Sequence, residues 1–521
     1  MESKASPREF RRTSPSLHDG HESHVDYRVL FGLLILSLVV YAPLLGRWPI
    51  SGDEFYTFED SSFSISKMLS FNSRPLYFIV CHYLLKWNPG LPVELVIRLP
   101  AMLAASLVAP SLYFFLPKGR FAHVGVLAGL IAVFNPWLFE MSQFGRYYAF
   151  VIFFATVATL AALRWVEERR RVWPILFIVS GLFAAVSHPP AVLIIPGGIL
   201  AWLAAGFREN PDAVMRLVKK YGAMAAAAVV VAAAIGVYLL RDLLSEWFGA
   251  KLGDFGNSNP KDIVLALAIL GGLSWWSLAL IPMLRFPSAW SKQDVFLVTM
   301  LVGSTAPLLM LTPFGGGVAA RYFLYCLPCM FLLAAQHWQQ IDERLPTFGY
   351  RLAFGCALFA FNVPYLLSIA VDGNHFDNRQ VARAIESMGI ENPMIYASSH
   401  RLVDYYLNDE FEIQSEREDD LGLFENGVPR EFLERAIKKA AEQNRPLLLV
   451  SRQDRTLMSD DDQEWLYARF AVVRTIETAR YDHRRFRVVV YQYRPAPGAT
   501  KNVAGQYTAN DIMHEEIEML P

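Results

Sequence analysis

The sequence predicts a polytopic α-helical membrane protein that carries a smaller α/β domain at its C-terminal end. The chain of 521 residues is 54% hydrophobic and only 19% charged, whereas a soluble globular protein is roughly 45–50% apolar and about 25% charged. The apolar residues lie in blocks of about 20, a length that crosses the hydrocarbon core as a helix. Beyond residue 371 the composition becomes polar, which indicates a separate domain.

The apolar blocks predict about eleven membrane spans. They follow a polar N-terminal segment, 1–28, which we expect to be disordered and cytoplasmic. The expected spans are 29–46, 98–116, 121–139, 147–166, 173–187, 190–206, 221–240, 261–283, 293–312, 321–337 and 351–371.

The first outer loop, 47–97, contains one further apolar segment. Residues 74–87 read RPLYFIVCHYLLKW, which is short for a span and includes Arg74, His82 and Lys86. We therefore expect an amphipathic helix that lies at the membrane interface. Counting it as a span would reverse the side of every later loop.

The loop charges predict the orientation of the chain. Every second loop is basic, and basic loops stay in the cytoplasm. The N-terminus is then cytoplasmic, and the C-terminal domain lies outside the cytoplasm. The expected location is a bacterial inner (cell) membrane, with the functional site on its extracytoplasmic face. The basic loops fall within 118–120, 167–171, 208–220, 285–292 and 344–351.

Residues 372–521 predict an α/β domain. Apolar runs of strand length alternate with one helical stretch, 430–443, and this alternation is typical of α/β folds. The strand-like runs are PMIYAS, RPLLLVS, FAVVRTIE and RFRVVVYQYRP.

Several classes of function are disfavoured by composition and motifs. The net charge of −1 gives no field that would attract nucleic acid. No Rossmann glycine motif follows a strand, and there is no Walker loop. Cys326 and Cys329 have CxxC spacing within an expected span, where small buried hydrophobic residues are the favoured interpretation. No metal site is predicted.

Polar residues gather at the expected outer ends of the spans. The acidic pair Asp53-Glu54 follows the first span, where a carboxylate could supply a general base. The alternative is helix capping by Ser51 or Asp53.

A second polar group joins the third and fourth spans and contains Glu140, Arg146 and Tyr147. The guanidinium of Arg146 offers a fork of donors that suits a phosphate, and interfacial anchoring is the alternative. His188 forms the turn after the fifth span, where it is either a satisfied turn residue or a site residue. Arg321, followed by Tyr322, opens the tenth span and could bind a lipid phosphate or snorkel to the headgroups.

One orientation places all of these residues on the outer face. Cations that hold a leaving phosphate, beside a carboxylate that deprotonates a hydroxyl, are what a lipid-phosphate donor requires. The residues concerned are Asp53, Glu140, Arg146, His188 and Arg321.

The order of these motifs resembles that of the GT-C glycosyltransferases, in the branch that includes protein O-mannosyltransferases and the lipid A aminoarabinose transferase. The match is spread over about 50–340. Its motifs are Asp53-Glu54, Arg-Pro-Leu-Tyr at 74–77, Arg98-Leu99-Pro100, Asn-Pro at 135–136 with Ser-Gln-x-x-Arg-x-Tyr at 142–148, His188, and Arg321-Tyr322.

The resemblance implies a GT-C-like catalytic domain at 29–371 that transfers a sugar from a polyprenyl-phosphate donor, with inversion. The acceptor would be an extracytoplasmic glycan, lipid or protein. Asp53 would be the catalytic base within the pair Asp53-Glu54, and Arg146 and Arg321 would hold the donor phosphate. The remaining substrate-binding candidates are Arg74, Glu140, Tyr147, His188 and Tyr322.

The sequence departs from the pattern at Phe144, where many relatives have Glu. Glu140 could replace that residue, since positions i and i+4 share a helix face. The second acidic site, and with it a divalent cation, therefore stays open. No other cofactor is predicted.

Two other functions compete with the enzyme. A lipid-linked sugar flippase or membrane transporter is disfavoured because the spans hold few charges and no paired broken helices in corresponding halves. A sensor whose outer domain is the receptor leaves Asp53 and Arg321 unexplained.

Overall fold

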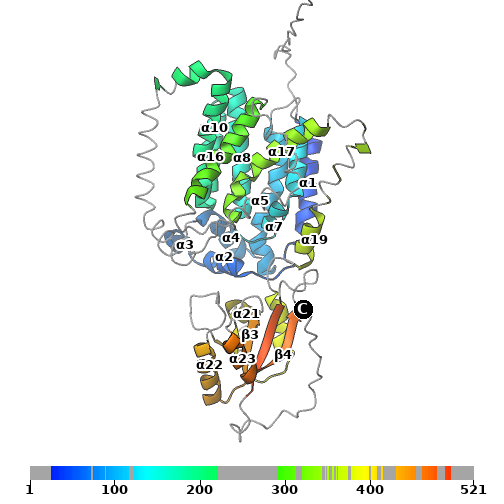
Figure 1. Cartoon of the computed structure of the whole chain (residues 1–521), viewed down its shortest axis with the longest axis vertical. Helices are drawn as coiled ribbons and strands as arrows, with labels where there is room; N and C mark the ends of the chain where they lie inside the picture. Colours follow the sequence, from blue (N-terminus) through cyan, green and yellow to red (C-terminus); the bar gives the residue numbers. More distant parts are fainter. Residues whose placement is uncertain are drawn as a thin grey trace, which may run out of the picture.

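The computed structural model places a bundle of helices at one end of the molecule and a mixed β-sheet at the other (Figure 1). The structure describes residues 25–71, 74–88, 90–116, 122–216, 219–220, 290–311, 320–342, 347, 349–350, 355–356, 360, 362–372, 377–397, 400–407, 412–414, 430–452, 460–477 and 487–494.

The first helix, α1 (Tyr27–Tyr41), begins before the expected end of the N-terminal segment. Asp26 caps it, because its carboxylate accepts a hydrogen bond from the backbone N–H of Arg28 at 2.9 Å. The expected disorder up to residue 28 is therefore wrong at 27–28, and 1–24 lie outside the described residues. A short 3₁₀ helix, η1 (Ala42–Leu44), continues α1.

The bundle is built mainly from long apolar helices. Within the described residues, four helices are long and apolar enough to cross a membrane, or five if a bent pair counts as one span. The expected spans 221–240 and 261–283 lie outside the described residues, so the number eleven stays a prediction. The bundle helices are α5 (Val93–Phe115), α6 (Ala122–Val133), α8 (Tyr148–Glu168), α9 (Val172–Ser187), α10 (Ile194–Glu209), α16 (Lys292–Leu311), α17 (Leu327–Asp342) and α19 (Val363–Asp372).

The expected straight span 121–139 is a bent pair. Helix α6 meets α7 (Pro136–Ser142) at 60°. The bend occurs at Asn135, whose side chain accepts from the N–H of Leu138 at 3.0 Å and so begins a new helix. Pro136 follows at the first helical position, where its lack of an N–H has no cost.

Three short helices form the segment expected to be the first outer loop: α2 (Gly52–Ser62), α3 (Ile65–Phe71) and α4 (Pro75–Lys86). Helix α4 occupies the segment expected to be amphipathic. Its residues Tyr77 and Cys81 are fully buried in the bundle core, whereas Tyr83 is 56% exposed. Its position relative to the membrane stays a prediction.

The C-terminal part forms a five-stranded sheet with the order β2-β1-β3-β5-β4. Strand β1 pairs in parallel with β2 and β3, and β5 pairs antiparallel with β3 and β4. The strands are β1 (Met394–Ala397), β2 (Glu412–Gln414), β3 (Leu447–Arg452), β4 (Phe470–Glu477) and β5 (Arg487–Tyr493).

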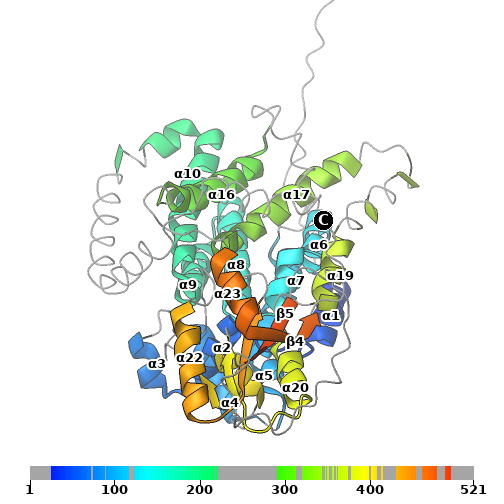
Figure 2. The ribbon, with the colours of Figure 1, turned by 60° about the horizontal axis from the view of Figure 1, so that its bottom comes forward.

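Helices cover both faces of this sheet. On one face α20 (Asn378–Glu386) and α21 (His400–Leu407) share a core with the strands. On the other face α22 (Arg430–Glu442) and α23 (Asp460–Arg469) do so. Figure 2 shows the sheet and its helices in front of the end of the bundle that carries α2, α3 and α4.

Helix α21 joins the sheet to the bundle. The hydroxyl of Tyr406 accepts from the N–H of Ile50 at 2.7 Å and donates to Glu94 Oε1 at 3.1 Å. The ring of Tyr405 lies 6.0 Å from that of Phe55 and 5.9 Å from that of Phe58. Helix α2 is therefore held between the bundle and the C-terminal sheet.

Candidate functional site

The acidic pair Asp53-Glu54 lies in the first turn of α2, which a capping box begins. Ser51 Oγ accepts from the N–H of Glu54 at 3.2 Å, and Glu54 Oε2 accepts from the N–H of Ser51 at 3.0 Å. The capping by Ser51 expected as an alternative is therefore confirmed. It uses the side chain of Glu54 and leaves that of Asp53 to make other contacts.

Glu54 is fully buried in an ion pair with Arg98 of α5. Arg98 Nε lies 2.6 Å from Oε1 and Nη2 lies 2.7 Å from Oε2, so the pair is bidentate. The N–H of Gly145 donates to the same Oε1 at 2.7 Å. Glu54 thereby links α2, α5 and the loop before α8. This geometry favours a structural role for Glu54 over the expected catalytic one.

Asp53 points instead to the tenth expected span, which the structure resolves into η7 (Ala320–Cys326) followed by α17. Asp53 Oδ2 lies 3.2 Å from Nη1 of Arg321, and both side chains keep about a third or more of their surface exposed, at 36% and 42%. The two residues are 268 positions apart in the sequence. A carboxylate is thus accessible beside a cation.

A second guanidinium, that of Arg146, approaches α2 from the α7–α8 loop. Its Nη1 donates to the backbone oxygen of Asp53 at 2.9 Å and to Thr57 Oγ1 at 3.4 Å. The Nε atoms of Arg146 and Arg321 are buried, and neither has a hydrogen-bond partner among the described residues. Because buried N–H groups are nearly always paired, these two fit an additional acceptor at this position.

Contacts with aromatic rings connect Arg74, His188 and Tyr322 to Tyr147, the neighbour of Arg146 in the chain. Arg74 Nη1 donates to the hydroxyl of Tyr147, and the Arg74 guanidinium lies 4.8 Å from the same ring. His188, at the end of α9, is fully buried and stacks on Tyr147 with ring centroids 5.3 Å apart. The ring of Tyr322 is also 5.3 Å from His188.

The structure therefore brings seven of the nine predicted residues into one connected cluster, which we call the Asp53 cluster. It lies at the end of the bundle that faces the C-terminal sheet (Figures 1 and 2). Its members are Asp53, Arg74, Arg146, Tyr147, His188, Arg321 and Tyr322. Glu54, next to Asp53 in the chain, contacts Arg98 and the N–H of Gly145 instead.

Glu140 is half-buried on α7 and does not enter the contacts described above. The expectation that Glu140 and Phe144 share a helix face is wrong, because α7 ends at Ser142. A replacement role for Glu140 stays a prediction. Phe144 is buried and stacks on Tyr148 at 6.2 Å. This position is part of an aromatic layer.

Sequence reasoning missed Asp60, which follows Asp53 and Thr57 on the same face of α2. Partial burial raises the pKa of the Asp60 carboxyl to about 6, although the Arg146 guanidinium opposes this shift. The sequence did contain a signal for Asp60: it lies seven residues after Asp53 and three after Thr57, and positions with this spacing line one side of a helix. Asp60 adds a second titratable acid to this side of the site.

The sequence left open whether acidic side chains at this site could bind a divalent cation. Within the described residues, no three His, Cys, Asp or Glu side chains are grouped closely enough to hold a metal ion. Asp53 is already paired with the cation of Arg321. The same cluster contains three guanidinium groups, those of Arg74, Arg146 and Arg321.

The fold was compared with those of solved structures. The structure of ArnT from Cupriavidus metallidurans in the apo state superposes with a TM-score of 0.50 over 89% of this chain and 98% of that chain, at 13% sequence identity. The chain has the fold of ArnT. The ArnT fold is the GT-C fold expected from the order of motifs.

Two further structures give TM-scores of 0.48. One is ArnT from Cupriavidus metallidurans bound to undecaprenyl phosphate, at 14% identity over 92% of this chain and 99% of that chain. The other is the archaeal oligosaccharyltransferase AglB from Archaeoglobus fulgidus in complex with an inhibitory peptide and a dolichol-phosphate, at 10% identity over 81% of this chain and 69% of that chain. No protein-family model matches the sequence, and a comparison with curated proteins gives no match.

Proposed function

We propose that the protein is a membrane glycosyltransferase that transfers a sugar from a polyprenyl-phosphate donor to an extracytoplasmic glycan, lipid or protein. The observation that carries this proposal is the Asp53 cluster: one accessible carboxylate among three guanidinium groups, at one end of an ArnT-like bundle. The motif resemblance supports the donor class, and the fold agrees with it.

Asp53 acts as the general base in this reaction. Its carboxylate takes the proton of the acceptor hydroxyl while that oxygen forms a bond to the anomeric carbon. The bond from the anomeric carbon to the phosphate oxygen breaks on the opposite face, and its electron pair leaves with the polyprenyl phosphate. The configuration at the anomeric carbon is therefore inverted.

The arginines stabilise the charge that moves during this step. The donor is a phosphodiester, and the released polyprenyl phosphate carries one more negative charge. Asp53 loses its negative charge when it is protonated, so the positive charge of Arg321 is then balanced by the released phosphate and no longer by the Asp53 carboxylate. The buried Nε groups of Arg146 and Arg321 supply donors of the kind that bind phosphate oxygens.

The aromatic residues of the cluster orient the arginines. Arg74 is held on Tyr147 by a hydrogen bond and by its position over the ring, and His188 packs behind that ring. A packed support of this kind fixes a guanidinium before the substrate binds. We assign Tyr147 and His188 to positioning, and Arg74 to the donor phosphate.

The C-terminal sheet shapes access for the acceptor. It meets the site side of the bundle through α21, and Tyr405 lies against the helix that carries Asp53. This arrangement supports an accessory role for residues 372–521, outside the cytoplasm. An acceptor reaches Asp53 from the side of this domain.

Purified protein in liposomes with a radiolabelled polyprenyl-phosphate sugar tests the proposal. Membranes from a strain that lacks the gene provide the acceptor. Transfer of label to an acceptor, with release of polyprenyl phosphate, is the expected result. Movement of the intact donor between leaflets without release would instead establish the flippase.

A further inference from the structure

A separate pocket lies at the opposite end of the bundle, where α8 and α10 end and α16 begins. Its cavity volume is about 230 Å³, below the roughly 300–1,000 Å³ of pockets that enclose drug-sized ligands. Apolar residues, including Leu203 and Val214, line it together with Arg169, Glu209 and Lys292. The Asp53 cluster does not use any of these residues.

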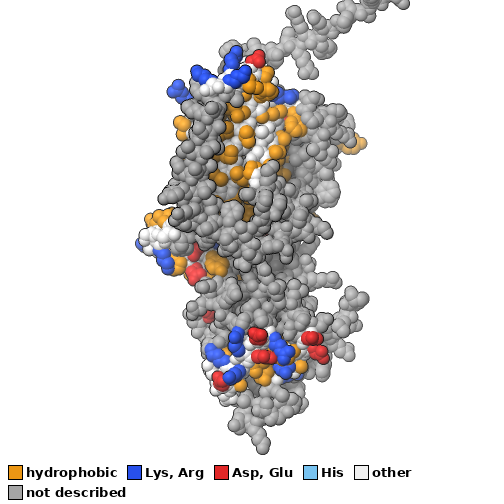
Figure 3. Space-filling view, turned by 60° about the vertical axis from the view of Figure 1, so that its left-hand side comes forward, with side chains coloured by type: hydrophobic (Ala, Val, Ile, Leu, Met, Phe, Trp, Pro, Cys, Tyr) orange, Lys and Arg blue, Asp and Glu red, His pale blue; other side chains and the backbone are white. Residues whose placement is uncertain are grey.

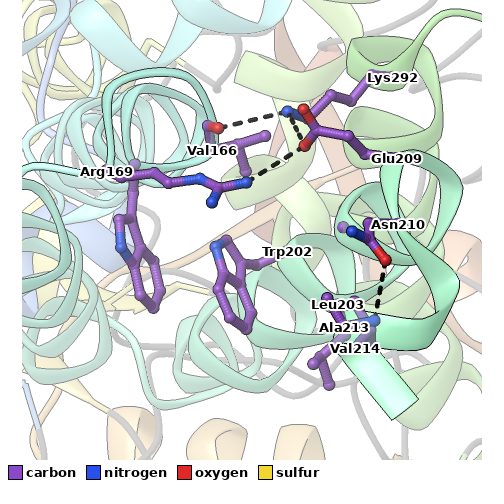
Figure 4. A pocket seen from close by; sticks show the side chains of 11 residues that line it. Val166, Arg169, Trp202, Leu203, Glu209, Asn210, Ala213, Val214 and Lys292 are labelled. Atoms are coloured by element: carbon purple, nitrogen blue, oxygen red, sulfur yellow. Dashed lines mark hydrogen bonds and ion pairs between the residues drawn. The ribbon is translucent and has the colours of Figure 1, made fainter. Parts of the chain in front are cut away.

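One carboxylate holds both cations of this pocket in place. Lys292 Nζ lies 2.8 Å from Glu209 Oε2, and Arg169 Nη2 lies 3.5 Å from the same oxygen. Figure 4 shows the two cations reaching Glu209 from different sides, above Trp202. The three groups carry a net charge of about +1 at neutral pH, and the Arg169 side chain is 77% exposed.

The aromatic lining places the pocket at a membrane interface. The rings of Trp165 and Trp202 stack with centroids 4.8 Å apart and planes inclined by 11°. Tryptophan is enriched where acyl chains meet headgroups. Trp165 lies one turn before the end of α8 and Trp202 about two turns before the end of α10, and both helices belong to segments long and apolar enough to span a membrane.

The surroundings carry an excess of cations. Figure 3 shows Lys and Arg side chains at this end of the molecule, next to a band of hydrophobic side chains. Phe207 on α10 is 50% exposed beside this basic end. The exposed cations nearby are Arg170, Arg171, Arg208, Arg216, Lys219 and Lys220.

We propose that this pocket binds the headgroup of an anionic phospholipid. The phosphate meets the free N–H groups of Arg169 and Lys292, and the acyl chains lie along the apolar surface of α10. A small cavity suits this ligand because only the headgroup enters it. Basic pockets between membrane helices are known to select anionic lipids in this way. This inference is independent of the proposed function.

The test is native mass spectrometry of the purified full chain in detergent, with phosphatidylglycerol and phosphatidylcholine of identical acyl chains. We expect retention of phosphatidylglycerol to exceed that of phosphatidylcholine by about tenfold. The double variant Arg169→Gln/Lys292→Gln should lose this preference. Arg169→Gln alone changes an exposed side chain and should show a partial loss without a folding defect.

The matched control is Arg170→Gln/Arg171→Gln, which removes the same charge from exposed residues outside the pocket and should keep the preference within about twofold. Equal losses in the two double variants would overturn the proposal, because they would indicate general attraction to the basic surface. Glycerol phosphate without acyl chains should not compete at concentrations at which the lipid binds. Competition at equal concentration would identify a site for a soluble phosphate and would also overturn it.

Discussion

The Arg321 guanidinium lies 3.2 Å from Asp53 and carries a buried Nε with no described partner. If Arg321 binds a phosphate, the affinity depends on the geometry of its guanidinium N–H groups as well as on its charge. We therefore expect both Arg321→Lys and Arg321→Ala to weaken donor binding by about tenfold or more. A side chain that only snorkels to headgroups would be replaced by lysine without loss.

Donor affinity measured for both variants in the same lipid separates these roles. Lys219→Ala, which removes an exposed cation at the opposite end of the bundle, is the control. Wild-type affinity in Arg321→Lys would make Arg321 an anchor, and Arg146 would be the next residue to test.

Asp60 predicts a pH dependence of stability. Burial raises the pKa of its carboxyl from 3.8 to about 6, so the folded state holds this proton more tightly than the unfolded state does. Between about pH 4 and pH 6 the free energy of unfolding therefore falls as the pH rises, and the loss is complete above the folded-state pKa. Asp60→Asn removes the ionised form and should raise the melting temperature by about 1–3 °C near pH 8.

The same substitution should raise the melting temperature much less near pH 4.5, where most of this loss has not yet occurred. The exposed Asp212→Asn provides the control at both pH values. An equal effect of Asp60→Asn at the two pH values would show that the side chain acts through packing and not through its titration.

At the scale of elements, Glu54 and Arg98 hold α2, α5 and the α7–α8 loop together. Removing one partner of a buried ion pair leaves an unpaired charge and costs about 3–5 kcal/mol. Glu54→Gln should therefore lower the melting temperature in detergent markedly, whereas Glu386→Gln, on the exposed face of α20, should not. The double variant Glu54→Leu/Arg98→Leu should lose less stability than the sum of its single variants.

This series also separates the structural role of Glu54 from the catalytic one expected from the sequence. A Glu54→Gln protein with the wild-type melting temperature and greatly reduced turnover would restore the catalytic assignment.

The sequence allowed many elements to be predicted, because the signal for each is local. Apolar blocks predicted α5, α8, α9, α10 and α16, and strand-like runs predicted β1, β3, β4 and β5. The bend between α6 and α7 was missed, since the apolar run continues through Asn135. Strand β2 has only three residues and is recognisable only by its pairing with β1.

The residues of the Asp53 cluster could be predicted from the sequence, but their contacts could not. Loop charge and motif order placed Asp53, Arg146 and Arg321 on one side of the membrane. They could not show that Glu54 pairs with Arg98, because the two residues are 44 positions apart and only the fold brings them together. The contacts of Asp53 and Glu54 differ for this reason, although the two are adjacent in the sequence.

At the scale of the whole molecule, the proposed reaction requires the C-terminal sheet to lie outside the cytoplasm. A membrane-impermeant maleimide applied to intact cells tests this orientation. In a Cys356→Ser background, which leaves only buried cysteines among the native four, Glu442→Cys should be labelled and Arg170→Cys should not. Both positions are well exposed, at 64% and 76%.

Labelling of Arg170→Cys and not of Glu442→Cys would show the opposite orientation, with the Asp53 cluster on the cytoplasmic side. Lysed cells, in which both positions should react, show that each probe is competent.

The turnover of Asp53→Asn shows whether Asp53 removes the proton from the acceptor. Asparagine keeps the size of the side chain but cannot act as a base. With radiolabelled polyprenyl-phosphate sugar and acceptor membranes, we expect wild-type donor affinity within about threefold and turnover reduced by about 10²–10⁴-fold. Near-normal turnover in a variant that binds the donor would exclude Asp53 as the general base.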